Sequence, residues 1–482
     1  MEKLLNAKFF LSVLLATIAF VAGCADTRPF EAETTAPRET AAETTPISYP
    51  ARIVPYIEPH SPARGGETEA GDSHQSGDSE GEEFAKAQPS GAEAPLVEET
   101  TAAEPDGGRI EAPVLPQGSR EILTEPSRQR ARKQGGRSYS FVAVGDNVVH
   151  TGIWLEAKQR AAAREDREYW FAPVFDNIAD MIRDADIAFI NQETLLAGDE
   201  LGFSNYPRFN GPQDIGRDIV ELGFDIVNIA NNHMVDKGEV GLRGAIEFWE
   251  SQPVVMIGGY KNYEDYKKIR TIERDGVSIA LLSYTFSTNG LSLPKNSELY
   301  IPYIDYAEIK TQIEEAKKLA DLVFVSVHWG EENIFTPTSG QVSIAQYMAD
   351  LGADVIIGHH PHVVQPITWL RGKGGNDTLC IYSLGNIVSL MAAPYNMVGG
   401  VMTFDITEAE DGWFVENPVF VPTVFFYATN FFSQKIYLMR DFTEELAVRM
   451  GTKNYGYTAT LAQLRGYVTK TIHPAFLPDY MK

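Results

Sequence analysis

Residues 354–363 read DVIIGHHPHV, an apolar run that leads directly into a histidine cluster. The run at 355–357 predicts a buried strand, and three of the nine histidines of the chain follow it. Histidines in a loop just past a strand end are typical of a metal site. Taken alone, the motif also fits a polar surface turn, so the other strand ends must distinguish the two readings.

Apolar runs and helical patterns alternate from residue 138 onward. Strands are predicted at 139–144, 187–190, 226–229, 254–257, 277–282, 322–327 and 378–382, and helices at 175–183, 215–222, 240–250, 306–319 and 342–351. This alternation predicts an α/β fold with a largely parallel sheet. Further along, 401–404 and 419–422 predict a hairpin around Gly412, and 441–471 predicts two helices.

Polar side chains recur at the carboxyl ends of five predicted strands. They are Asp146, Glu193, Asn232 with His233, His328, and His360 with His362. Open α/β sheets bind their ligands at this edge. One such residue would be explained by turn or cap chemistry, but five together predict a shared metal site.

The donor atoms in this set are carboxylate and amide oxygens and imidazole nitrogens, without thiolates. This mixture suits Mn, Fe or Zn. Six ligands (Asp146, Glu193, Asn232, His328, His360, His362) are enough for two ions that share a bridging carboxylate. A pair of ions ~3.5–4 Å apart can clamp the attacking and leaving oxygens of a hydrolysis.

His233 follows Asn232 directly and is the candidate general acid of the site. Asp236 lies one turn further and would orient that imidazole. The alternative for Asp236 is an ordinary carboxylate at a helix start.

The chain begins with a short basic stretch and an apolar run at 9–22 that is too short for a comfortable membrane span. The run ends in Val21-Ala22-Gly23-Cys24, and small residues before a cysteine resemble the lipobox of bacterial lipoproteins. The resemblance implies a signal peptide at 1–23, lipidation of Cys24, and export to the extracytoplasmic face of a bacterial membrane. An ordinary secretory signal with an accidental cysteine is the alternative.

Residues 24–137 predict a disordered acidic linker ahead of a folded domain at 138–482. From 25 to 125 there are 21 acidic against 7 basic residues and no periodic apolar pattern. The net charge of −25 argues against a nucleic-acid partner. A solvated linker end, or alternatively a contact with anionic lipid or with the linker, is expected for the basic cluster of Arg128, Arg130, Arg132, Lys133 and Arg137.

An ordered series of motifs resembles the CapA family, capsule proteins of poly-γ-glutamate biosynthesis related to calcineurin-like metallophosphatases. The motifs are GD at 145–146, NQE at 191–193, ANNHMVDKG at 230–238, VHWG at 327–330, GHHPHV at 358–363 and YSLGN at 382–386. The resemblance spans roughly 139–386. It implies a sandwich of two mixed β-sheets flanked by helices, with a dinuclear metal site at the strand ends.

Position by position, Asp146 resembles the first-motif aspartate of metallophosphatases, and Glu193 stands where a bridging aspartate is usual. Asn232 and His233 match the family's Asn-His pair, a ligand and a catalytic imidazole. His328 matches the isolated later histidine.

The end of the series matches the family's His-x-His, with His360 and His362 as ligands. One departure concerns the first motif, where Asp-x-His is usual and Val148 takes the place of the histidine. His150 lies two residues further and would either substitute or serve as a polar loop residue.

Other polar residues would support the ligands or contact an anionic substrate. This set contains Arg208, Lys237, Glu331, Glu332, His359 and Asn386. The two glutamates would otherwise simply face water.

The resemblance implies a lipid-anchored protein of poly-γ-glutamate capsule synthesis or export, with a metal-dependent hydrolase-type site. Its expected partners are an anionic polymer such as poly-γ-glutamate and membrane synthase subunits. A non-catalytic subunit that binds or guides the polymer is one alternative, favoured by Val148. A generic exported metallophosphoesterase unrelated to capsule is the other.

Overall fold

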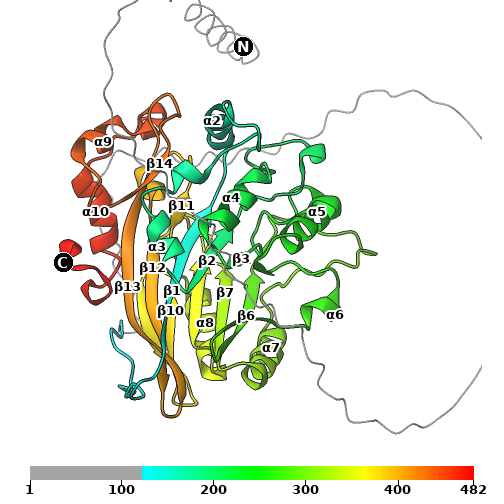
Figure 1. The fold of residues 1–482 in the computed structure, drawn as a ribbon, viewed down its shortest axis with the longest axis vertical. Coiled ribbons are helices and arrows are strands. Elements are labelled where there is room, and N and C mark those ends of the chain that lie inside the picture. The colour runs from blue at the N-terminus through cyan, green and yellow to red at the C-terminus, as the bar shows by residue number, and fades with distance from the viewer. Residues whose placement is uncertain (1–121) are drawn as a thin grey trace, which may run out of the picture. The chain divides into compact units, whose positions relative to one another are not determined.

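The computed structural model describes residues 122–482. The expected signal peptide, Cys24 and linker residues 24–121 lie outside this part of the chain. The described residues form two mixed β-sheets flanked by helices (Figure 1), as the resemblance implied.

Within residues 122–482, fourteen strands build the two sheets. They are β1 (Ser138–Asn147), β2 (Ile187–Gln192), β3 (Ile226–Asn228), β4 (Val255–Ile257), β5 (Arg270–Arg274), β6 (Val277–Thr285), β7 (Leu322–His328), β8 (Val355–His359), β9 (Ile367–Arg371), β10 (Asp377–Ile381), β11 (Asn386–Val388), β12 (Val398–Ala409), β13 (Gly412–Phe426) and β14 (Lys435–Leu438).

The first sheet has the order β14-β13-β12-β1-β2-β3-β4, with β11 also pairing with β1. Strands β1 to β4 and β11 are parallel, whereas β12, β13 and β14 continue the sheet in antiparallel pairs. The second sheet has the order β5-β6-β7-β8-β10-β9 and is parallel from β6 to β10, with antiparallel strands at both edges. The parallel centres of both sheets therefore bring their carboxyl ends to a common edge.

The sheets pack face to face through aromatic side chains. Phe141 of β1 lies 5.2 Å from Phe324 of β7 and 4.7 Å from Phe404 of β12, measured between ring centroids. Val323 and Val325, on either side of Phe324 in β7, point to the opposite face of the second sheet. Because both faces of β7 are covered, its run from Leu322 to Val325 is continuously apolar rather than alternating.

Helices cover the outer face of each sheet (Figure 1). The apolar stripes of α4 and α5 join the core with the first sheet, and those of α7 and α8 join the core with the second. The helices are α2 (Thr151–Ala161), α3 (Ala179–Arg183), α4 (Asp214–Leu222), α5 (Gly238–Glu250), α6 (Tyr263–Tyr266), α7 (Tyr306–Leu319), α8 (Ser339–Leu351), α9 (Glu444–Arg449) and α10 (Leu461–Thr469).

The predicted elements are mostly present, with differences near residues 150–183. The predicted helix at 175–183 is a short 3-10 turn, Ala172–Val174, followed by α3. Helix α2 was not predicted, and neither were the edge strands β5 and β9. The hairpin around Gly412 and the two C-terminal helices are confirmed.

Residues 122–137, assigned from composition to the linker, lie against the folded domain. Leu123 lies beside strand β9. Its backbone N–H donates to the hydroxyl of Thr368, and its carbonyl accepts the N–H of Trp369. The basic cluster pairs with acids of the β12–β13 hairpin: Arg130 with Asp411 (2.5 Å), Arg132 with Glu416 (2.8 Å), Lys133 with Glu408 (2.7 Å) and Arg137 with Glu408 (3.1 Å). We call residues 122–137 the arm. Composition missed it because its partners lie far away in sequence.

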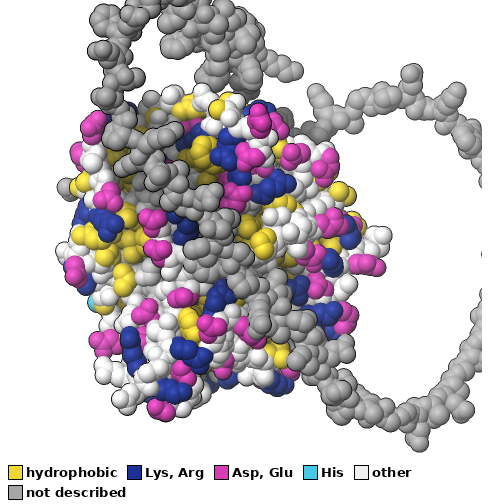
Figure 2. Space-filling view, in the orientation of Figure 1, with side chains coloured by type: hydrophobic (Ala, Val, Ile, Leu, Met, Phe, Trp, Pro, Cys, Tyr) yellow, Lys and Arg dark blue, Asp and Glu magenta, His cyan; other side chains and the backbone are white. Residues whose placement is uncertain are grey.

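Figure 2 shows acidic and basic side chains interspersed on one face of the described residues. No helix among residues 122–482 is both long enough and apolar enough to cross a membrane.

Candidate metal centre

The six predicted metal ligands meet at the carboxyl edge of the two sheets. Asp146 lies near the end of β1, His328 ends β7, and the others follow β2, β3 and β8. All six are buried: Asp146, Glu193, Asn232, His328, His360 and His362. Parallel strands from different parts of the chain thus deliver them to one place.

Two buried groups of ligand atoms share Glu193. One group combines Asp146, Glu193 and His362, the other Glu193, His328 and His360, and within each group the atoms lie within 4.8 Å of one another. Glu193 Oε1 is 3.5 Å from His362 Nε2 and 3.8 Å from His328 Nε2. Asn232 joins the second group, with Oδ1 3.0 Å from His328 Nε2.

Glu193 has the environment of a metal ligand rather than of a structural acid. Its carboxylate is completely buried, and neither oxygen has a hydrogen-bond partner. Burial therefore raises the pKa of Glu193 well above its usual value. A buried carboxylate without partners is strongly unfavourable, and a cation between the histidines would supply the missing interaction. The residues present therefore fit divalent ions.

The imidazoles are prepared for binding in two ways. Burial, together with the charge of a neighbouring histidine, lowers the pKa of His360 to about 3 and that of His328 well below its usual value, so both are neutral. Burial opposes the charged form of His362, but the carboxylates of Glu193 and Asp146 outweigh it and raise the pKa to about 10. His362 therefore carries a proton that a bound ion would replace.

Asp146 is held ionised by its neighbours. Burial acts to raise its pKa, but hydrogen bonds from His359 and His362 hold the pKa well below the usual range. His359 Nδ1 lies 3.3 Å from Asp146 Oδ1, and its ring stacks on Phe189. His359 thus contacts Asp146, and its supporting role stays a prediction.

The loop that carries His360 and His362 is unusually tight. Both residues have left-handed backbones, with φ of 96° and 55°. Such conformations are unfavourable for residues with a side chain and cluster at functional sites. The N–H of His360 donates to Asp146 Oδ2 at 3.2 Å. Gly358 lets the end of β8 lie against Tyr382, because a Cβ there would be 2.0 Å from Tyr382 O.

Asn386 fixes the orientation of His362. His362 Nδ1 lies 2.9 Å from Asn386 Oδ1, which leaves Nε2 directed toward Glu193. A partner on the other ring nitrogen is typical of metal-binding histidines, because it sets the tautomer.

The predicted contact between His233 and Asp236 is present. His233 Nδ1 lies 2.7 Å from Asp236 Oδ2, which also accepts the N–H of Phe209 at 2.6 Å. The ring of Phe209 contacts His233 edge to face at 4.7 Å. These contacts fix the imidazole beside Asn232, while its catalytic role stays a prediction.

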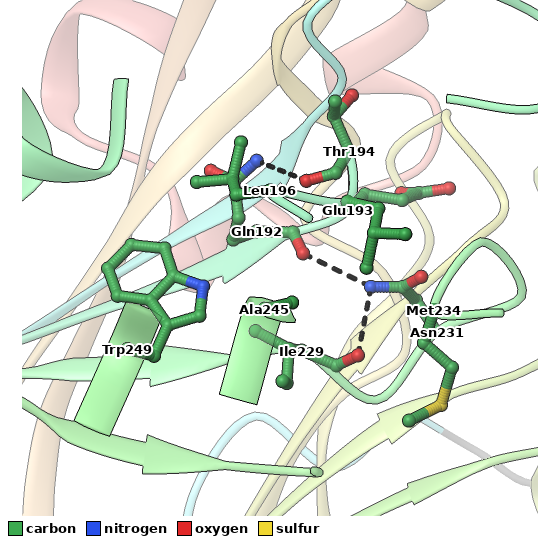
Figure 3. A pocket seen from close by; sticks show the side chains of 10 residues that line it. Gln192, Glu193, Thr194, Leu196, Ile229, Asn231, Met234, Ala245 and Trp249 are labelled. Atoms are coloured by element: carbon green, nitrogen blue, oxygen red, sulfur yellow. Dashed lines mark hydrogen bonds between the residues drawn. The ribbon is translucent and has the colours of Figure 1, made fainter. Parts of the chain in front are cut away.

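Asn231 ties the loop after β3 to strand β2. Figure 3 shows its side-chain amide donating to the carbonyls of Gln192 and Ile229. Its Oδ1 accepts the N–H of His233 at 2.9 Å. A cavity of about 10 Å³, room for one water, lies here behind Glu193.

His150 does not replace the missing first-motif histidine in either buried group. Its Nδ1 lies 3.0 Å from Val148 O and 3.2 Å from the N–H of Leu390, so this nitrogen is engaged with backbone. Burial lowers the pKa of His150 to about 4. Arg208 is exposed, Lys237 is half-buried, and their roles stay predictions.

A relay of amides behind Asp146 was not predicted from the sequence. Asn191 donates to Asp146 Oδ1 at 2.8 Å, Asn228 donates to Asn191 Oδ1 at 2.7 Å, and Ser283 donates to Asn228. Asn191 and Asn228 are polar residues at the ends of otherwise apolar strands, and that position was the available signal.

Glu331 is exposed and belongs to none of the ligand groups formed by the described residues. Its neighbour Glu332, also exposed, forms a third group with His360 and His362. Of the two glutamates in the turn after β7, only Glu332 therefore lies close to predicted metal ligands among the described residues.

Comparisons with known proteins identify the family of the chain. Residues 140–391 match the family of bacterial capsule synthesis proteins PGA_cap. The chain is 39% identical over 170 residues to the PGA biosynthesis protein CapA of Bacillus subtilis (strain 168), covering 35% of this chain and 43% of that protein. It is 30% identical over 228 residues to the capsule biosynthesis protein CapA of Bacillus anthracis, covering 45% and 53%. The chain thus spans about half the length of these curated relatives.

Among solved structures, a similar one is the calcineurin-like phosphoesterase YfkN from Bacillus subtilis. It is 14% identical, with a TM-score of 0.34 over 68% of this chain and 99% of that chain. The family match covers more than half of the chain and includes both buried ligand groups and the His233–Asp236 pair. The chain therefore belongs to the family of bacterial capsule synthesis proteins PGA_cap.

Proposed function

We propose that this protein is a metal-dependent hydrolase of poly-γ-glutamate capsule synthesis or export. The observation that carries the proposal is Glu193, a buried carboxylate without a hydrogen-bond partner that two groups of metal-ligating side chains share. A structural acid would be hydrogen-bonded, whereas Glu193 has only the charge of His362 at 3.5 Å, and a bridging ligand must keep its oxygens free for the ions.

The ligands would be Asp146, Glu193 and His362 for one ion and Glu193, Asn232, His328 and His360 for the other. When bound, two such ions polarise a phosphoryl or carbonyl oxygen and activate water for hydrolysis. The site is buried, and electrostatic interactions inside it are correspondingly strong.

His233 would move a proton at the edge of this site. Its Nδ1 faces the carboxylate of Asp236, which leaves Nε2 to give a proton to a leaving group or to take one from water.

The substrate is proposed to be poly-γ-glutamate, cut at its amide linkage, or a phosphoester of the same pathway. The names of the relatives support the capsule context: the Bacillus subtilis protein is a PGA biosynthesis protein and the Bacillus anthracis protein a capsule biosynthesis protein. We further propose that Cys24 carries a lipid that holds the protein at the extracytoplasmic face of the membrane, beside synthase subunits.

The test measures bound metal and turnover in the same protein preparations. The purified chain, the His233→Ala variant and the control variant His473→Ala are analysed for Mn, Fe and Zn, then assayed on para-nitrophenyl phosphate and on poly-γ-glutamate. His473 is an exposed histidine outside the site and controls for loss of an imidazole. Two ions per chain, with turnover lost in His233→Ala and kept in His473→Ala, is the expected result.

A second function, non-catalytic polymer binding, is favoured by one observation. Val148 and the backbone contacts of His150 leave the first ion with three ligands from the buried set. Protein that binds metal and poly-γ-glutamate but cuts neither substrate would establish this function and reject the hydrolase.

A further inference from the structure

Glu332, in the turn after β7, lies beside two of the predicted metal ligands. Its carboxylate oxygen and one ring nitrogen each of His360 and His362 lie within 4.8 Å of one another. Of these three side chains Glu332 is the exposed one. His362 belongs to the first buried group and His360 to the second, so Glu332 lies near one histidine of each group.

The turn that carries Glu332 is anchored on the histidine loop itself. The N–H of Asn333 donates to Pro361 O at 2.8 Å, between the two histidines. Asn333 Oδ1 accepts from Asn396, whose amide also donates to His362 O at 3.2 Å. An exposed side chain held in this way differs from one on a loose surface loop.

The other parts of the turn are equally fixed. Trp329 is buried, and its backbone N–H donates to His359 O at 3.1 Å. The carbonyl of Ile334 accepts from Gln365 at 2.7 Å. Backbone contacts on both sides of Glu332 therefore hold it next to His360 and His362, while Glu331 belongs to none of the ligand groups.

The buried ligand set is incomplete at one position. The first group offers only Asp146, Glu193 and His362, since Val148 carries no donor atom and His150 is engaged with backbone. A structural Zn²⁺ site takes four protein ligands, and a catalytic one takes three with water in the fourth position, whereas Mn²⁺ favours six ligands, so the first group has room for one more side chain. A carboxylate oxygen is acceptable to both ions.

We propose that Glu332 is a metal ligand of this site, binding from the exposed turn after β7 and completing the ligand set that Val148 leaves short. This inference rests on the proposed metal centre.

The experiment measures ion binding rather than turnover. The full chain is stripped with a chelator and titrated with Mn²⁺, and the free ion is followed by electron paramagnetic resonance. Glu332→Gln keeps the size of the side chain but removes its charge and replaces one acceptor oxygen with an NH2 group. Glu331→Gln is the matched control, because the adjacent glutamate is also exposed.

The expected result is that Glu332→Gln binds at least one Mn²⁺ about 10- to 100-fold more weakly than the unmodified chain, as for losses in a ligand shell. Glu331→Gln is expected to stay within about twofold, since it removes an equal charge without a ligand atom. Far-ultraviolet circular dichroism checks that both variants fold.

Two other outcomes would overturn different conclusions. If Glu332→Gln titrates like the unmodified chain, or if both variants weaken binding equally, Glu332 is not a ligand, while the proposed hydrolase stands. If the unmodified chain binds neither Mn²⁺ nor Zn²⁺, the metal centre itself is refuted, and the inference fails with it.

Discussion

Replacing Glu193 with glutamine tests whether its carboxylate is held for metal ions. The side chain is completely buried, both oxygens lack hydrogen-bond partners, and burial raises its pKa. The substitution keeps the shape and removes the charge. We expect it to abolish stabilisation by metal while changing the metal-free protein little.

The magnitude follows from two opposing effects. Without metal, glutamine removes a charge that is unfavourable to bury but also the attraction to His362, so the free energy of unfolding changes by no more than about 1 kcal/mol. With metal at a hundred times the dissociation constant, the unmodified chain gains about 2.7 kcal/mol. That gain corresponds to on the order of 3–5 °C in Tm for a folded part of this size.

The assay is thermal unfolding with and without Zn²⁺ or Mn²⁺. Glu156→Gln is the matched control, because Glu156 is also a buried glutamate but is paired with Arg160 and with the backbone of Ser433 and Gln434. It is expected to lower Tm equally in both conditions and to keep the metal-dependent shift. Equal metal-dependent shifts in the unmodified chain and in Glu193→Gln would refute the assignment.

Four further outcomes are expected. His233→Ala is expected to lower turnover about 10²- to 10⁴-fold, and Asp236→Asn is expected to lower it as well, while both ions stay bound. Metal analysis and steady-state kinetics on the same preparations check this. Because the pKa of His362 is about 10, apparent metal affinity falls about tenfold per unit as pH decreases from 10 toward 7, and uptake releases protons that a pH electrode detects. Glu408→Ala frees the arm, so that trypsin cuts at 128–137 sooner than in the unmodified chain. Cys24→Ser moves the protein from the membrane fraction to the soluble fraction, as immunoblotting of the fractions would show.

The convergence of the ligands was predictable because it depends on a local pattern repeated along the chain. Each apolar run before Asp146, Glu193, His328 and His360 ends in a polar residue. Parallel strands share a carboxyl edge, so residues at successive strand ends must meet there. The His233–Asp236 contact was predictable because it is also local, since the partners are only three positions apart in the chain.

Local patterns could not predict the division into two sheets or the packing of the arm against the folded domain. Strand β12 pairs with β1 across more than 250 residues, with Phe141 opposite Phe404. The arm is polar and basic and resembles a linker in composition. Its order depends on Glu408, Asp411 and Glu416, acids of a hairpin far along the chain.

The sequence by itself determined which side chains reach the metal centre from the strand ends, since apolar periodicity fixes where each strand stops. Only the tertiary structure decided which neighbours act on those side chains. The selection of Glu332 over Glu331 depends on Asn333 binding Pro361 O, and the orientation of His362 depends on Asn386. These are hydrogen bonds between separate loops, and their geometry exists only after the two sheets have packed together.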